Sequence, residues 1–131
     1  MADEPQIILG IDPGSRITGF GIIKIEGARR EYMGSGCIRT EGTVFADKLK
    51  QIYDGVTEVI TQYKPSLFAI EQCFVSKNVA STIKLAHVRT AAIIAALNHN
   101  LEIGEYSPRQ IKQSVAGYGN AEKVQVQHMV C

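Results

Sequence analysis

The sequence predicts an α/β fold in which helices cover a mixed sheet. An apolar strand-like run near the N-terminus, two further strand-like segments joined by a glycine turn, and helices alternating with strands after them point to it. With 131 residues the chain is long enough to bury one hydrophobic core. We therefore expect a single domain over residues 1–131.

The first third of the chain predicts an antiparallel meander of three strands. Ile7–Asp12 is a short apolar run that ends in an acid, and Ile17–Ile25 is a second strand-like segment. The polar stretch Glu26–Arg30, with Gly27 inside it, is typical of a hairpin turn. Tyr32–Arg39 then supplies the third strand.

Helices and strands alternate over the rest of the chain. Apolar residues at three- and four-residue spacing between Leu49 and Tyr63 predict a helix, and Pro65 marks its end. The later elements that we expect are a strand at Ser66–Glu71, a helix at Asn78–Asn98, a strand at Leu101–Tyr106, and helices after Ser107 and after Asn120.

The helix expected at Asn78–Asn98 has an unusually wide apolar surface. Its large apolar residues lie on more than one side of the helix: Val79, Ile83, Ala86, Ile93, Ile94 and Leu97. A helix with this pattern is either central in the fold or part of a subunit interface.

Composition and charge exclude few functions. The formal net charge is +1, so any basic surface for nucleic acid would have to be local. No apolar run approaches the roughly 20 residues that span a bilayer, and the N-terminus is acidic and polar, so we expect no membrane association and a cytoplasmic protein. Three cysteines without a CxxC pair are expected to be reduced.

Asp12 and Glu71 are the two acids that stand out, because each ends an otherwise apolar strand. If the two strands are parallel neighbours, both carboxylates emerge at the same edge of the sheet. Clustered carboxylates attract a hard cation such as Mg²⁺ or Mn²⁺, which supports phosphodiester hydrolysis. Either acid alone would more simply be a strand-end residue that reaches solvent.

Residues near these two acids offer weaker signals. Ser15 and Arg16 follow Gly14 in a tight turn, which is able to meet a phosphate through its N–H groups but is equally an ordinary hairpin. Phe74 is able to stack on a base, although a core phenylalanine is commoner.

Basic and histidine side chains add little by themselves. Lys112 and Lys123 flank a glycine-containing loop, and as a pair they are read simply as solvated charge. His87, His99 and His128 show no metal-ligand spacing, and we assign them no role.

Four segments together resemble the RuvC family of Holliday-junction resolvases: ILGIDPGSRITGFG, SGCIRT, FAIEQCFVSKN and GYGNAEKVQVQHMV. The resemblance runs from about Ile7 to the last residue, and the order of elements is similar to the ribonuclease-H-like fold. It implies a homodimer that binds four-way junction DNA and nicks two symmetrically placed strands. It also implies Mg²⁺ as the cofactor, with Mn²⁺ as a substitute, and the RuvAB branch-migration complex as a partner.

The resemblance also implies roles for single residues. Asp12 and Glu71 match metal-binding catalytic acids, and Lys112 and Lys123 match basic residues that act near the scissile phosphate. Phe74 matches an aromatic that contacts junction bases, and the wide apolar helix matches the family's dimer helix. The residues expected to contact DNA are therefore Ser15, Arg16, Phe74, Lys77, Arg89, Lys112 and Lys123.

The chain departs from the family pattern in two places. Where the family commonly reads LGQ-x-RG, this chain reads LAHVRT from Leu85 to Thr90, which affects helix packing or a DNA contact. The family also carries two further catalytic acids in a D-x-x-D stretch on a C-terminal helix, which is not in these 131 residues. We therefore expect residues 1–131 alone to hold metal weakly and to cleave poorly.

Three alternatives stay open. Residues 1–131 alone would act as a junction-binding module without catalysis. GIDPGS is also similar to the first phosphate loop of actin-like ATPases, although these need a second lobe and a second glycine-rich motif. A related nuclease of the YqgF type that acts on RNA is disfavoured by the FVSKN and GYGNAEK segments.

Overall fold

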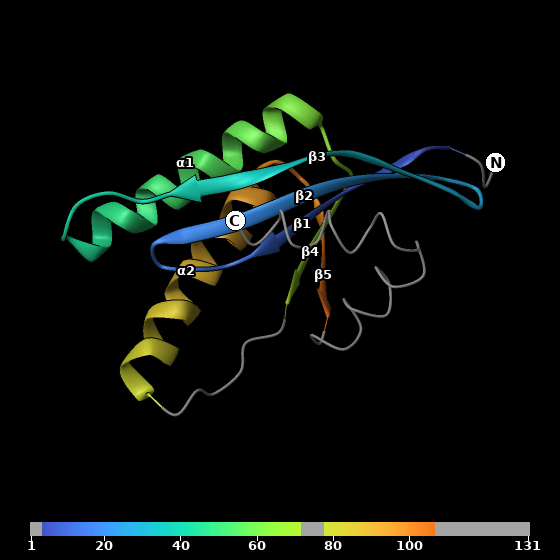
Figure 1. Ribbon diagram of the computed structural model, residues 1–131. Helices are drawn as coiled ribbons and strands as arrows, with labels where there is room; N and C mark the ends of the chain where they lie inside the picture. The colour runs from blue at the N-terminus through green and yellow to red at the C-terminus, as the bar shows by residue number, and fades with distance from the viewer. Residues whose placement is uncertain (1–3, 72–77, 107–131) are drawn as a thin grey trace.

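The computed structural model describes residues 4–71 and 78–106, which form five strands and two helices (Figure 1). In chain order these are β1 (Gln6–Asp12), β2 (Ile17–Glu26), β3 (Arg29–Arg39), α1 (Phe45–Tyr63), β4 (Leu67–Glu71), α2 (Val79–Asn98) and β5 (Glu102–Tyr106). Every element expected within these ranges is confirmed. The helices expected after Ser107 and Asn120 lie outside the described residues.

The five strands form one mixed sheet in the order β3-β2-β1-β4-β5. β1, β2 and β3 pair antiparallel as a meander, whereas β4 pairs parallel with both β1 and β5. The connections from β1 to β4 and from β4 to β5 are therefore crossovers, which contain α1 and α2. This confirms the predicted α/β class with a three-stranded meander and parallel strands.

Two boundaries differ by more than one residue from the sequence-based expectation. β3 begins at Arg29 rather than Tyr32, because its pairing with β2 continues to Glu26 opposite Arg29 and leaves only a two-residue turn. Gly27 takes the left-handed conformation in that turn, with φ of 61°. α1 begins at Phe45, one turn before the apolar periodicity becomes clear, because its first turn is largely exposed and carries few core residues.

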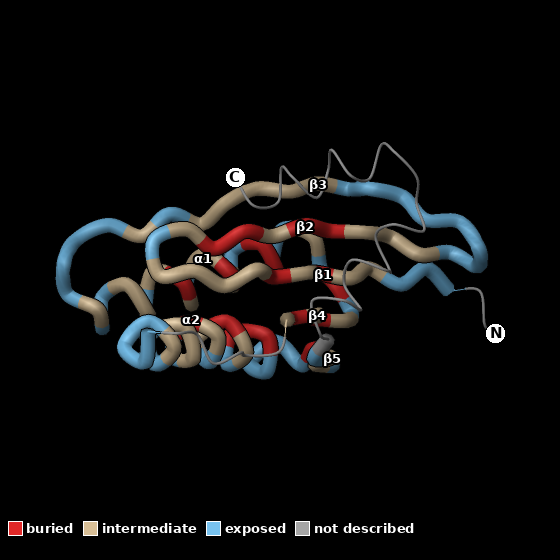
Figure 2. Tube along the Cα trace, turned by 60° about the horizontal axis from the view of Figure 1, so that its bottom comes forward, coloured by how far each residue is buried: buried red, intermediate tan, exposed pale blue. Residues whose placement is uncertain are grey.

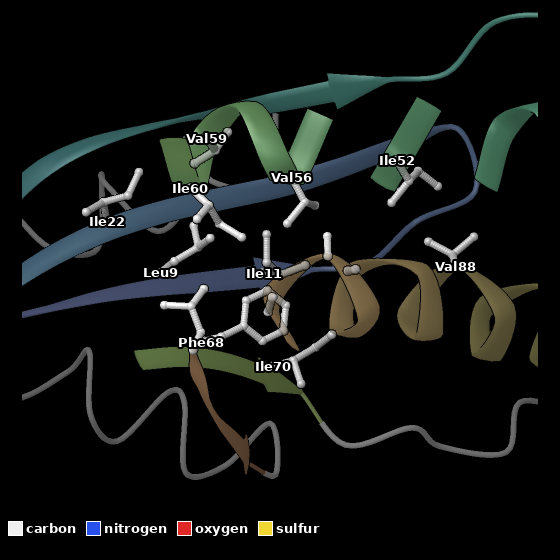
Figure 3. Close-up of a cluster of buried hydrophobic side chains, with 14 residues drawn as sticks. Leu9, Ile11, Ile22, Ile52, Val56, Val59, Ile60, Phe68, Ile70 and Val88 are labelled. Atoms are coloured by element: carbon white, nitrogen blue, oxygen red, sulfur yellow. The ribbon is translucent and has the colours of Figure 1, made fainter. Parts of the chain in front are cut away.

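The hydrophobic core lies between one face of the sheet and both helices (Figure 3). Strand side chains such as Leu9, Ile22 and Phe68 are fully buried and point toward α1 and α2. The helices supply the rest of the core: Ile52, Val56, Val59 and Ile60 from α1, and Val88, Ala92, Ala95 and Ala96 from α2. The small alanines let α2 pack closely against its neighbours.

The second face of the sheet carries the acid that ends β1. Side chains alternate along a strand, so Gly10 and Asp12 lie on the face opposite the buried Leu9 and Ile11. Residues without large side chains are in register across four strands of this face, namely Gly21, Gly10, Ala69 and Gly104. Asp12 therefore projects from a part of the sheet that has little side-chain bulk beside it.

α2 has two apolar faces, and only one of them packs in the core. Its core face contains the buried Val88 and the three alanines described above, and other positions along the helix are exposed (Figure 2). Four of the exposed positions carry large apolar side chains. These exposed residues are Val79, Ile83, Ile94 and Leu97, which we call the α2 stripe. The wide apolar surface predicted from the sequence is confirmed, because the fold buries one side of it only.

The expectation that no segment is long enough to cross a membrane was wrong. By length and composition alone, α2 is apolar enough to do so, although one such helix is weak evidence. The sequence argument searched for an uninterrupted apolar run, whereas α2 interrupts its apolar residues with Lys84 and Arg89. On its packed face, Val88, Ala92, Ala95 and Ala96 are buried in the core.

The expectation of reduced cysteines was also wrong for Cys37. This residue, on β3, is disulfide-bonded, whereas Cys73 and Cys131 lie outside the described residues. Spacing along a sequence does not show which thiols the fold brings together, and this is why the pattern of three cysteines was misread.

Candidate acidic site and the turn beside it

Asp12 and Glu71 end adjacent parallel strands. β1 pairs parallel with β4, and the last matched positions are Ile11 opposite Ile70. The next residue on each strand is the acid, so the two carboxylates leave the same edge of the sheet on strands about 4.8 Å apart. Both acids also lie on the same face, because the residues just before them, Ile11 and Ile70, are both buried in the core. The parallel pairing of the two strands, on which the expectation depended, is confirmed.

The carboxyl group of Asp12 is half-buried and has no compensating partner among the described residues. Burial raises the pKa of Asp12 above its ordinary value of 3.8, because removal from water disfavours the charged form. No hydrogen bond or ion pair from the described part of the chain offsets this cost. A buried carboxylate in this condition is suited to a cation.

Glu71 is held in place through its backbone by Arg89. The Nε of Arg89 donates to the carbonyl oxygen of Glu71 at 3.1 Å, and its Nη2 donates to Oε1 of Glu105 at 2.5 Å. The Arg89 side chain is only 15% exposed, against 50% for Glu105. Arg89 therefore joins α2 to the ends of β4 and β5 and fixes the strand end from which Glu71 projects.

Sequence reasoning missed the role of Glu105 in this arrangement. Glu105 lies one residue before the end of β5, and a third strand-end acid was the available signal. Its partner is 16 residues away, so spacing did not reveal the ion pair. The DNA contact predicted for Arg89 stays a prediction, and any such contact would compete with the two protein partners.

A buried hydroxyl shapes the turn that follows Asp12. Thr18, with no exposed surface, accepts a hydrogen bond from the N–H of Gly14 at 3.2 Å and donates to the carbonyl oxygen of Gly14 at 2.9 Å. Thr40, just after β3, donates from its hydroxyl to the carbonyl oxygen of Ser15 at 2.7 Å. The turn that presents Ser15 and Arg16 is therefore fixed from two directions.

The turn has no room for a side chain at Gly14. A Cβ built there would lie 2.1 Å from the carbonyl oxygen of Ile17, which is a backbone atom and cannot move aside. Glycine is required at this position because of close approach between backbone segments. Its role is steric, and the turn's suitability for phosphate stays a prediction.

The remaining candidate residues are four that lie outside the described ranges and two histidines that lie within them. Phe74, Lys77, Lys112 and Lys123 lie outside the described residues. His87, to which we assigned no role, packs its ring edge-on against Phe45, with ring centroids 6.1 Å apart. The Nδ1–H of His99 donates to the carbonyl oxygen of Ala95 at 2.8 Å at the C-terminal end of α2.

Asp12 and Glu71 are the two candidate metal ligands in the described part of the chain. Within the described ranges, 4–71 and 78–106, no group of three or more His, Cys, Asp or Glu side chains is positioned to hold an ion. Carboxylate oxygens are the ligands that Mg²⁺ and Mn²⁺ prefer. The donor type and the uncompensated burial of Asp12 thus fit a divalent cation, with few ligands from this region.

This sheet order, with helices on one face and acids at the ends of the central parallel strands, defines a ribonuclease-H-like domain. A family model described as "Crossover junction endodeoxyribonuclease RuvC" matches residues 8–131. The chain belongs to the RuvC family. This confirms the family that the sequence motifs indicate.

Individual relatives agree with the family match. The chain is 61% identical over 124 residues to crossover junction endodeoxyribonuclease RuvC of Tolumonas auensis, covering 95% of this chain and 72% of that protein. The same identity and coverage hold for the protein of that name from Pseudoalteromonas atlantica. These relatives therefore extend beyond the region that the present chain matches.

Solved structures share the fold. The Thermus thermophilus RuvC structure superposes with a TM-score of 0.74 at 25% identity, covering 86% of this chain and 70% of that one. The same protein in complex with a Holliday junction substrate gives 0.74 at 22% identity, covering 85% and 70%. The yeast mitochondrial Holliday junction resolvase gives 0.61 at 13%, covering 87% and 55%. The last two likenesses concern the fold alone.

Replacement of Asp12 by asparagine should stabilise the metal-free protein at neutral pH. Burial raises the pKa of Asp12 in the folded state above its ordinary value of 3.8. Below pH 3.8 the group is protonated in both states and does not lower the free energy of unfolding, whereas above the folded-state pKa the buried charge lowers it by the full amount. The melting temperature gained by Asp12→Asn should therefore be absent at low pH and appear as pH rises through this window. Asp54→Asn, which removes an exposed and paired carboxylate, is the control and should bring no gain. A loss of stability at neutral pH in Asp12→Asn would contradict our account.

Removal of the Arg89 guanidinium should loosen the ends of β4 and β5. We expect Arg89→Gln to lower the free energy of unfolding by about 1.5–3 kcal/mol, the usual range for a charged hydrogen-bonding group. Glu105→Gln keeps the Arg89 bond to the Glu71 carbonyl and should cost less. Urea titration measures both changes, and equal losses would show that the backbone bond contributes little.

Proposed function

We propose that this protein resolves Holliday junctions as a metal-dependent endodeoxyribonuclease. The observation that carries the proposal is the in-register pairing of β1 and β4, which places Asp12 and Glu71 side by side in a chain of the RuvC family. The names of its relatives describe the same activity, and one solved relative is bound to a junction substrate. The proposed role is in recombination and DNA repair.

Asp12 and Glu71 are the proposed catalytic metal ligands. Mg²⁺, or Mn²⁺ in its place, would supply charge neutralisation at the phosphate and an activated water. Asp12 contributes a half-buried carboxylate, and Glu71 contributes one whose strand end is fixed by Arg89. Two acids give few ligands, so we propose that residues 1–131 alone hold the metal weakly and cleave slowly.

DNA contacts are proposed for both sides of this acidic site. Ser15 and Arg16 lie in the fixed turn directly after Asp12, where backbone N–H groups and one guanidinium are able to meet a phosphate. The family resemblance supports further roles for residues outside the described ranges: Phe74 for bases at the crossover, and Lys77, Lys112 and Lys123 for phosphates.

The α2 stripe is the proposed homodimer contact. Four large apolar side chains on one helix face are between 43% and 67% exposed, and surfaces of this kind usually mark an interface. Thr90 and Ala86, two of the departures from the family pattern, lie at intervals of three and four residues between Ile83 and Ile94. The departures therefore change the centre of this contact. A further proposed partner is the RuvAB branch-migration complex.

Cleavage of a four-way junction tests the enzymatic proposal. The gene product that carries this sequence should nick two opposed strands of a junction when Mg²⁺ is present, and leave a duplex of the same sequence intact. Glu71→Gln should lower the rate by more than about 100-fold, because changes even to outer-shell groups cost about 10–100-fold. Glu58→Gln makes the same chemical change on an exposed part of α1 and is the control. Equal cutting of junction and duplex would overturn the proposal.

Charge placed in the α2 stripe should separate the subunits. We expect Ile83→Glu and Ile94→Glu to shift the protein from dimer to monomer, because burying an unpaired carboxylate costs far more than the lost apolar contact. Met33→Glu, at an exposed apolar residue on β3, is the matched control. Sedimentation velocity over a range of concentrations measures the shift. A protein that is monomeric before substitution would exclude the proposed interface.

A further inference from the structure

We propose that a basic groove beside the acidic site holds the sugar–phosphate backbone of one junction arm. The groove consists of two adjoining hollows of about 690 Å³ and 390 Å³, which share Arg16 and Lys48 in their walls. This inference rests on the proposed function and extends it to a second DNA contact, distinct from the acids that hold the metal.

Positive charge is concentrated in the groove. Its walls contain four cations, Arg16, Arg39, Lys48 and Lys84, and a single carboxylate, Glu41. The whole chain has a formal net charge of only +1, so this is a local excess. None of the four cations forms a salt bridge within the described residues, whereas Lys50 pairs with Asp54 at 2.7 Å on the same helix as Lys48. Unpaired cations gathered in one hollow favour a polyanion.

Four chain segments bring these cations together. Arg16 comes from the turn after β1, Arg39 ends β3, Lys48 lies in the first turns of α1, and Lys84 lies in the second turn of α2. Thr40 fixes two of these segments to each other, since its N–H donates to the carbonyl oxygen of Arg16 at 3.0 Å. The cations are thus presented by ordered backbone rather than by a loose loop.

The start of α1 adds donors to the same groove. Thr43 lines one hollow and Phe45 the other, so the N-terminus of α1 lies between them. Val44 is the N-cap residue and makes no side-chain cap, which leaves N–H groups of the first turn for an outside acceptor. Such groups bind phosphate oxygens well, and here they supplement the charge of Lys48.

The shape of the groove favours a continuous backbone over one small anion. The two hollows are open and follow each other around Arg16 and Lys48, so a single phosphate would occupy only part of them. Arg16 is four residues beyond Asp12, and Ser15 of the same turn also lines the second hollow, so the groove begins at the turn that follows this acid. Double-stranded DNA, with one charge per roughly 1.7 Å of its axis, suits a row of cations.

Binding to a four-way junction in EDTA tests the groove without cleavage. Lys48→Gln combined with Lys84→Gln should weaken binding about tenfold and reduce the dependence of log Kd on log salt by up to about two phosphate contacts. The matched control combines Lys50→Gln with Arg29→Gln, which removes the same charge from α1 and from the distant β2–β3 hairpin. Lys48→Arg with Lys84→Arg keeps the charge and should keep the affinity.

The outcomes separate the groove from the proposed function. An equal loss in the control pair would show that only net charge matters and would overturn the groove, as would an unchanged salt dependence in the groove variant. Junction binding no tighter than duplex binding by the unsubstituted protein would instead contradict the proposed function. In that case the salt dependence on duplex DNA still tests the groove. Unchanged melting temperatures confirm that the exposed substitutions leave the fold intact.

Discussion

The parallel pairing of β1 with β4 is the contact on which the site depends. It aligns Ile11 with Ile70, and the core fixes this alignment because both side chains are buried against the helices. A slip of one residue would turn the buried side chains of a strand to the opposite face and carry its acid into the core. The packing of apolar residues therefore determines where two carboxylates meet, although neither acid belongs to the core.

The two acids that this pairing brings together differ in their surroundings. Asp12 is followed by a turn fixed by Thr18, and it is half-buried with no described partner to offset its charge. Glu71 instead ends a strand that Arg89 holds from α2. Burial thus raises the pKa of the Asp12 carboxylate, whereas a hydrogen bond to the backbone fixes the strand end that carries Glu71. Both effects depend on residues outside the pair of acids.

The sequence was sufficient to predict the elements and the position of Asp12 and Glu71, because apolar periodicity and strand-end acids are local signals. It did not predict the contact from Arg89 to Glu105, since that pair joins a helix to a strand 16 residues later. The cations of the basic groove come from four separate segments, and no spacing rule relates them. Cys37 belongs to the same class, because its bond depends on which parts of the chain meet. Contacts between residues far apart in the chain could not be predicted from the sequence.

The two-sided character of α2 has a consequence for how the protein persists in solution. One face completes the core of a single subunit, while the α2 stripe stays in contact with water until something covers it. If a second subunit covers it, folding and association draw on one helix, and apparent stability rises with protein concentration by mass action. A dilute preparation would then unfold more readily than a concentrated one of identical sequence.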